Sequence, residues 1–159
     1  MSTRCMVAIK GELSPYNIIH FYRHSDGYPE GVAPSIKKYL EYVSRDLIRK
    51  NAEQSAGWLL IIGMQEYLGQ YSHSNEKTLV KDITPTNAIS GYKIGAYELA
   101  TQFHSDIEYG YIVDISFGKV IQLTRDEYQS YMDSPSLYTE SMDFGEDITD
   151  FILNYNDEV

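Results

Sequence analysis

The 159 residues carry 23 acidic and 13 basic side chains, a formal net charge of −10, and 43% of them are hydrophobic. A charge of this sign repels nucleic acid and anionic membranes, so direct binding to either is not expected. The length and apolar share predict a single domain over residues 1–159. The only cysteine, Cys5, excludes an intrachain disulfide, and no stretch is apolar over the roughly 18 residues of a membrane span.

The N-terminal half predicts a hairpin followed by two helices. Cys5, Val7 and Ile9 alternate along 4–10, which predicts a half-buried strand that pairs with a second strand over 17–23. The glycines and proline of 24–33 predict irregular backbone, and Pro34 suits the first turn of a helix that continues to about residue 49. Asn51 precedes Gln54 by three residues and predicts the start of a helix over 52–68, which is apolar nearly all round and is expected at the centre of the fold.

The C-terminal half predicts a second hairpin, after a long polar surface connection over 69–94. Period-two alternation over 109–115 and a short run over 119–124 flank a turn at 116–118. The predicted fold is therefore α+β: two β-hairpins form a small antiparallel sheet that packs on two or three helices.

The last 35 residues hold most of the excess charge. Residues 125–159 contain ten acids against Arg125 alone, a balance of −9, while residues 1–124 contain 13 acids and 12 bases. Apolar side chains at 144, 148, 151, 152 and 155 fall on one face of a helix, and Asp143, Glu146, Asp147 and Asp150 fall on another. The pattern predicts an acidic amphipathic helix over 142–155. Matching to the helix dipole and solubility are the alternative explanation of these acids.

A second polar cluster precedes the first helix. His20 and Tyr22 share one face of a strand, His24 follows, and Asp26, Tyr28 and Glu30 lie in the next loop. Histidine beside carboxylate can bind a ligand or a divalent metal, or act as acid and base. The competing interpretation is structural, with the glycines of the loop supplying permissive backbone and Asp26 bonding nearby N–H groups. The loop matches neither a P-loop nor a dinucleotide-binding motif.

Two parts of the chain resemble a family of small bacteriophage and prophage proteins. The first part comprises Met1-Ser2-Thr3-Arg4 leading into Val7-Ala8-Ile9, and the run Tyr22-Arg23-His24-Ser25-Asp26-Gly27-Tyr28-Pro29-Glu30-Gly31. The second part runs from Asp106-Ile107-Glu108-Tyr109 to Asp114. The resemblance covers roughly 1–45 and 105–124 and leaves out the acidic tail, and Ser25 stands where the family motif has Trp. It implies a phage accessory gene expressed in the bacterial cytoplasm, and it carries over no catalytic residue.

The leading hypothesis from the sequence is a non-enzymatic phage inhibitor of a host protein. An acidic surface can substitute for phosphates and occupy a basic nucleic-acid-binding site, as an anti-CRISPR or other anti-defence protein would. The expected contact residues are acids of the tail and two tyrosines: Asp133, Glu140, Asp143, Glu146, Asp147, Asp150, Tyr131 and Tyr138. No cofactor or metal is expected in this role. The alternatives are a nucleotide- or metal-dependent protein that acts through His20, His24 and Asp26, and a homo-oligomer with a Tyr-rich interface.

Overall fold

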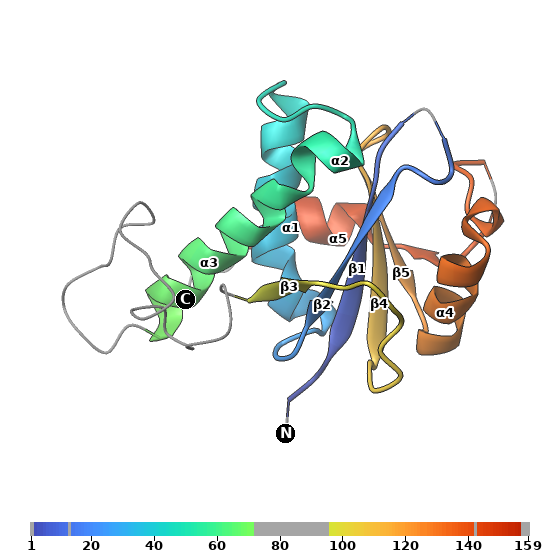
Figure 1. Ribbon diagram of the computed structural model, residues 1–159. Helices are drawn as coiled ribbons and strands as arrows, with labels where there is room; N and C mark the ends of the chain where they lie inside the picture. The colour runs from blue at the N-terminus through green and yellow to red at the C-terminus, as the bar shows by residue number, and fades with distance from the viewer. Residues whose placement is uncertain (1, 13, 72–95, 142, 157–159) are drawn as a thin grey trace.

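A computed structural model describes residues 2–12, 14–71, 96–141 and 143–156 of the chain, with only the backbone for 67–71. Six strands in these residues form one mixed sheet in the order β3-β2-β1-β4-β5-β6 (Figure 1). The elements are β1 (Cys5–Lys10), β2 (Ile18–Arg23), α1 (Pro29–Ser44), α2 (Ala52–Ser55), α3 (Gly57–Tyr71), β3 (Tyr97–Leu99), β4 (Tyr109–Asp114), β5 (Lys119–Leu123), α4 (Arg125–Asp133), a short 3-10 helix (Pro135–Leu137), β6 (Glu146–Asp147) and α5 (Thr149–Leu153). The predicted α+β class is confirmed. The predicted connection over 69–94 lies outside the described residues, apart from its first three residues, which end α3.

Both predicted hairpins form, but they do not build a purely antiparallel sheet. β1 pairs with β2 and β4 pairs with β5, each antiparallel. The two hairpins join through β1 and β4, which run parallel with Cys5 opposite Tyr109. After β3 the chain passes through residues 100–108 and enters β4 at the end of the sheet where β1 begins, so the two strands share a direction. The sheet also gains β3 and β6 at its two edges, which no hairpin signal indicated.

β1 is buried on both faces, where the alternation had predicted a half-buried strand. Cys5, Met6, Val7, Ala8 and Ile9 are all fully buried. A central strand with helices or loops on both sides has no solvent face, so its side chains form a continuous apolar run. Cys5 is the buried strand residue that the sequence predicted, and burial raises the pKa of its thiol to about 12.

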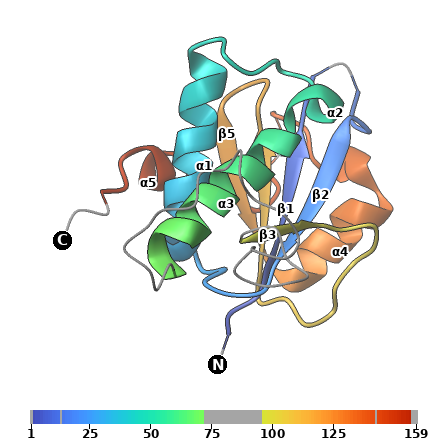
Figure 2. The same cartoon turned by 60° about the vertical axis from the view of Figure 1, so that its left-hand side comes forward.

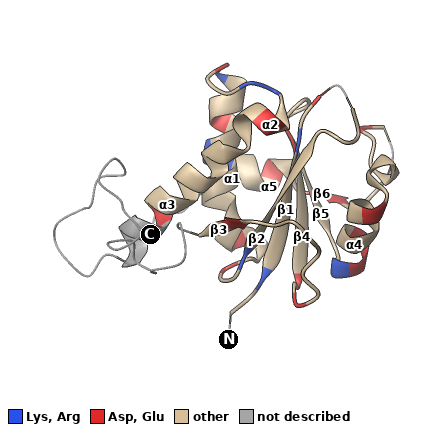
Figure 3. Ribbon diagram, viewed as in Figure 1, with Lys and Arg blue, Asp and Glu red and all other residues tan. Residues whose placement is uncertain are grey.

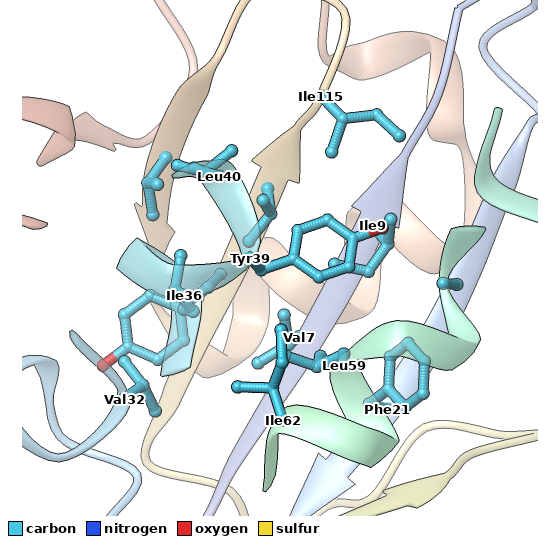
Figure 4. Close-up of a cluster of buried hydrophobic side chains, with 14 of the residues drawn as sticks. Val7, Ile9, Phe21, Val32, Ile36, Tyr39, Leu40, Leu59, Ile62 and Ile115 are labelled. Carbon is cyan, nitrogen blue, oxygen red and sulfur yellow. The ribbon is translucent and has the colours of Figure 1, made fainter. Parts of the chain in front are cut away.

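The first face of the sheet packs against α1, α3 and α5 (Figure 2). Its core includes Tyr39 of α1, whose ring lies beside Ile9 of β1 in Figure 4, together with Val7 of β1 and Leu59 of α3. The Tyr39 hydroxyl donates to the backbone carbonyl of Ser55 at 3.1 Å, so the buried phenol is satisfied. This layer holds α1 and α5 close together beside β5.

The second face packs against α4 and two loops. Its buried cluster joins Met6 and Tyr22 of the sheet to Tyr128 and Tyr131 of α4. Ile107 and Phe103 from the loop 100–108, and Tyr138 and Phe144 from the chain after α4, complete it. Thr124 caps α4 with a full capping box, in which its side chain accepts from the N–H of Glu127 and the Glu127 carboxylate accepts from the N–H of Thr124. This helix was absent from the predicted elements.

The first helix begins five residues before the predicted start. Pro29 occupies its first turn, where a missing N–H costs nothing, so the helix includes residues that were predicted to be irregular. Pro34 lies inside the helix and removes one bond, to the carbonyl of Glu30. Loss of a single bond near the N-terminus is tolerated because Val32 and Ile36 around it are buried against the sheet.

The second predicted helix is two helices, α2 and α3, and it does not lie at the centre of the fold. The predicted cap is confirmed, since the side chain of Asn51 accepts from the Gln54 N–H at 3.2 Å. Leu59 and Ile62 are buried, but Trp58 is 43% exposed. Because α3 covers one face of the sheet, only the stripe of side chains that faces the sheet is buried, even though its other sides are also apolar.

The predicted acidic helix over 142–155 is wrong. Glu146 and Asp147 form the edge strand β6, and only Thr149–Leu153 is helical. Gly145 adopts a φ of 77°, in the left-handed region, which breaks any helix at that point. Phe144 packs into the second face, whereas Ile148 packs into the first, so the segment wraps around the edge of the sheet. The apolar spacing that resembled one helical face reflects contacts with two different layers.

Candidate functional site

The loop between β2 and α1, with the first turn of α1, is held by a buried arginine. Arg23 donates from Nε to the carbonyl of Ser25 at 2.7 Å and from a terminal nitrogen to the carbonyl of Gly31 at 3.2 Å. The same nitrogen lies 3.0 Å from a carboxylate oxygen of Glu66 in α3. One guanidinium thus fixes both ends of the loop to the first-face layer, a bidentate role that lysine cannot take.

Backbone geometry explains the other residues of the loop. Asp26 has a φ of 57°, and its carbonyl lies so close to Gly31 that a Cβ there would be 2.0 Å away. The Tyr111 hydroxyl donates to the carbonyl of Gly27 at 2.8 Å. Tyr28 donates to the Asp26 carboxylate at 3.4 Å, and the negative charge of Asp26 raises the pKa of the Tyr28 hydroxyl. These contacts support the structural interpretation of the motif, with Glu30 exposed in the first turn of α1.

His20 and His24 have different hydrogen-bond partners. The Nδ1 atom of His20 lies 2.6 Å from the hydroxyl of Tyr128, in the second-face layer. Burial lowers the pKa of His20 to about 4, so the ring is neutral near pH 7. His24 contacts Tyr22 instead, and Asp26 contacts Tyr28. Each of His20, His24 and Asp26 thus hydrogen-bonds to a different tyrosine, and a ligand site formed by the three stays a prediction.

A different polar group surrounds Tyr22, and we refer to it as the Tyr22 cluster. The Tyr22 hydroxyl is 3.0 Å from Nδ1 of His24 and donates to the Asp106 carboxylate at 3.4 Å. The ring of His104 stacks on Tyr22 with centroids 4.1 Å apart. Arg4 lies 3.1 Å from Asp106. Three members, Arg4, His104 and Asp106, were missed by sequence reasoning, because no spacing signal connects them to His24.

The chemistry of the Tyr22 cluster is limited. Burial and the neighbouring Asp106 raise the pKa of the Tyr22 hydroxyl, so it stays protonated and is a poor nucleophile. Among the described residues, no group of three or more histidine, cysteine or carboxylate side chains has a geometry that could hold a metal ion. The cluster ties the loop 100–108 to the end of β2.

The acidic residues gather at the other edge of the sheet. Glu108, Glu127 and Glu146, from three separate segments, line a groove of about 560 Å³ that also includes Tyr109 and Gln122. On the opposite side of β6, Glu146, Asp147 and Asp150 line a second hollow of about 490 Å³. Glu146 borders both hollows. We refer to Glu108, Glu127, Glu146, Asp147 and Asp150 together as the acidic edge (Figure 3).

Few cations offset this charge. In the described stretch from 96 to 156, twelve acids accompany two bases, Lys119 and Arg125. Lys119 lies 3.5 Å from Glu140, and Arg125 lies 3.2 Å from Asp126. Lys119 also lines the second hollow, where the hydroxyl of Thr149 and, more weakly, the charge of Lys119 lower the pKa of Asp147. Five carboxylates against this one lysine leave the acidic edge with a negative potential.

One member of the acidic edge also has a local structural role. The Asp147 carboxylate accepts from the hydroxyl of Thr149 at 2.6 Å and from its backbone N–H at 2.9 Å. The hydroxyl contact is the larger cause of the lowered pKa of Asp147. Asp147 thus fixes the turn that leads from β6 into α5, and its replacement would change the local backbone as well as the charge.

The other predicted contact residues divide into two groups. Asp133, Glu140 and Asp143 are exposed but line neither hollow. Tyr131 and Tyr138 are buried, with 0% and 2% of their surface exposed, so they cannot touch a partner. Their prediction as contact residues is wrong, because Tyr131 of α4 and Tyr138, which follows the short 3-10 helix, both pack into the core of the second face.

No protein-family model, curated protein or solved structure matches this chain. None of the helices in the described residues combines the length and the apolar character that a membrane crossing requires. The site is therefore interpreted from its own geometry.

Proposed function

We propose that this chain is a non-enzymatic, phage-encoded inhibitor that binds a basic surface of a bacterial host protein through its acidic edge. The observation that carries the proposal is that five carboxylates line the two hollows beside β6, and Lys119 is the one base among the residues that line them. Fixed carboxylates on a folded edge can replace the phosphates that a nucleic-acid-binding channel normally holds.

The acids are attached to rigid elements, which favours binding. Glu146 and Asp147 belong to the sheet, Asp150 to α5 and Glu127 to the capped first turn of α4. A surface that is already ordered loses little conformational entropy when a partner binds. The alternative function, through His20, His24 and Asp26, is supported by no contact among these three side chains, each of which hydrogen-bonds to a different tyrosine.

We also propose that the protein acts in the bacterial cytoplasm, in an anti-CRISPR or other anti-defence role. This part of the proposal rests on the resemblance of the loop motif and of β4 to phage proteins. A host nuclease or its nucleic-acid channel supplies the basic surface that the acidic edge requires.

A charge reversal tests the proposal in a bacterium with an active CRISPR–Cas system. Expression of the chain is expected to raise the plaque count of a targeted phage. The variant Glu108→Lys/Glu146→Lys/Asp150→Lys is expected to lose this effect, because the attraction becomes repulsion. Asp147 stays unchanged in this variant to preserve its contacts with Thr149.

The matched control is Glu12→Lys/Glu41→Lys/Glu53→Lys, which changes net charge equally at exposed positions outside both hollows. The control is expected to keep full protection of the phage. Equal activity of the two triple variants would contradict the proposal, as would full activity of the variant at the acidic edge. Binding of the purified chain to the captured host protein should weaken with salt and compete with DNA.

A further inference from the structure

Two phenylalanines are exposed beside the acidic edge. Phe117, in the turn between β4 and β5, is 58% exposed, and Phe151, in α5, is 42% exposed. Both line the hollow of about 490 Å³ on the α5 side of β6, which we name the Phe117–Phe151 groove. Tight turns ordinarily carry polar residues, so Phe117 does not stabilise the turn in which it lies.

The rim of this groove is negative. Glu146, Asp147 and Asp150 line it together with the two rings. Its one base, Lys119, lies 3.5 Å from Glu140. An aromatic surface bordered by carboxylates repels an anionic membrane and a second copy of itself, and it attracts a segment that carries positive charge beside apolar side chains.

We propose that the Phe117–Phe151 groove binds a partner segment in which an apolar side chain is flanked by lysine or arginine. The inference rests on the proposed function and adds to it the chemistry of the partner. The apolar side chain packs between the two rings, and the flanking cations meet Glu146 and Asp150. Apolar anchors in a groove supply much of the affinity of such contacts, and the charges supply orientation and association rate. The acidic edge is then selective for a basic protein surface with an apolar residue in it, rather than for positive charge alone.

Two labelled peptides of equal charge test the inference by fluorescence anisotropy. The first, Lys-Leu-Lys-Trp-Lys-Leu-Lys, combines apolar and basic side chains, and the second, Lys-Ser-Lys-Gly-Lys-Ser-Lys, has the charge alone. The first peptide is expected to bind about tenfold or more tightly than the second, as burial of apolar side chains in a groove implies. Equal affinities would overturn the inference.

The variant Phe117→Ser/Phe151→Ser is expected to lower the affinity for the first peptide to that for the second. Both rings are substantially exposed, so the substitutions leave the core intact. The matched control is Leu47→Ser/Leu99→Ser, which removes two side chains that are 60% and 64% exposed and do not line the groove. An unchanged affinity in the phenylalanine variant, or an equal loss in the leucine variant, would overturn the inference.

The charge-reversal variant separates this inference from the proposed function. One outcome is that charge reversal weakens the binding of both peptides while the phenylalanine variant changes the affinity of neither. In that case the groove is not a docking site, and the acidic edge still is. If the phenylalanine variant weakens the binding of the first peptide and charge reversal changes the affinity of neither peptide, the partner segment is not basic. Both the inference and the proposed function then fail. Loss in both variants is the expected result.

Discussion

His20 makes the stability of this protein fall in mild acid. Its pKa is lowered from the usual 6.5 to about 4 because the ring is buried against Tyr128. The unfolded chain therefore binds a proton in the range between these values, and the folded chain does not. Above about pH 6.5, His20 does not lower the free energy of unfolding. As the pH falls from there toward 4, the free energy of unfolding decreases. With these two pKa values, His20 alone removes about 2 kcal/mol between pH 7.5 and pH 5.

Urea unfolding followed by far-ultraviolet circular dichroism at about pH 7.5 and about pH 5 measures this loss. His20→Gln keeps a neutral polar group near the Tyr128 hydroxyl but has no proton to gain. Its stability is expected to fall by about 2 kcal/mol less than that of the wild type over the same interval. The other histidines are common to both chains, so their contributions cancel in the difference. If both proteins lose the same free energy within about 0.5 kcal/mol, which is the usual precision of such comparisons, the argument about His20 is wrong.

Three further substitutions test close contacts inside the fold. Tyr138→Phe removes the hydroxyl that donates to the fully buried carboxylate of Asp114 at 2.6 Å, and a loss of about 2 to 3 kcal/mol in urea unfolding is expected. Tyr131→Phe is the matched comparison: the Tyr131 hydroxyl is buried without a hydrogen-bond partner in the described structure, so its removal should leave stability unchanged or slightly higher, and a loss equal to that of Tyr138→Phe would contradict the assignment. Gly31→Ala places a Cβ 2.0 Å from the carbonyl of Asp26, so the thermal midpoint should fall by several degrees, corresponding to about 2 kcal/mol or more; an unaltered midpoint would show that the loop can relax.

Local signals predicted much of this fold. The alternation in 109–115 gave the correct pairing with 119–123, and Asn51 with Gln54 correctly marked a helix start. The same capping signature occurs at Thr124 and Glu127, so α4 could have been found by the rule that found α2. These features depend only on residues a few positions apart.

Features that depend on distant contacts were missed. The apolar spacing from Phe144 to Tyr155 fits a helix, but Phe144 and Ile148 pack on opposite faces of the sheet, and a one-dimensional pattern cannot distinguish the two cases. The Tyr22 cluster unites β2 with Asp106, and the hydrogen bond between them joins residues 84 positions apart. The location of the acids in the tail was predictable, whereas their arrangement around β6 was not.

The parallel pairing of β1 with β4 determines when this sheet can be completed during synthesis. Cys5 lies opposite Tyr109 and Lys10 opposite Asp114, so about a hundred residues must be made before the first strand acquires its second neighbour. Until then one edge of β1 is unpaired, and five of the six side chains of this strand are apolar, so the strand is of the kind that pairs with other chains. The loop that must close is long, so this contact is expected to form late and slowly. A nascent chain stopped between β2 and β4 is therefore expected to be the species most prone to aggregation.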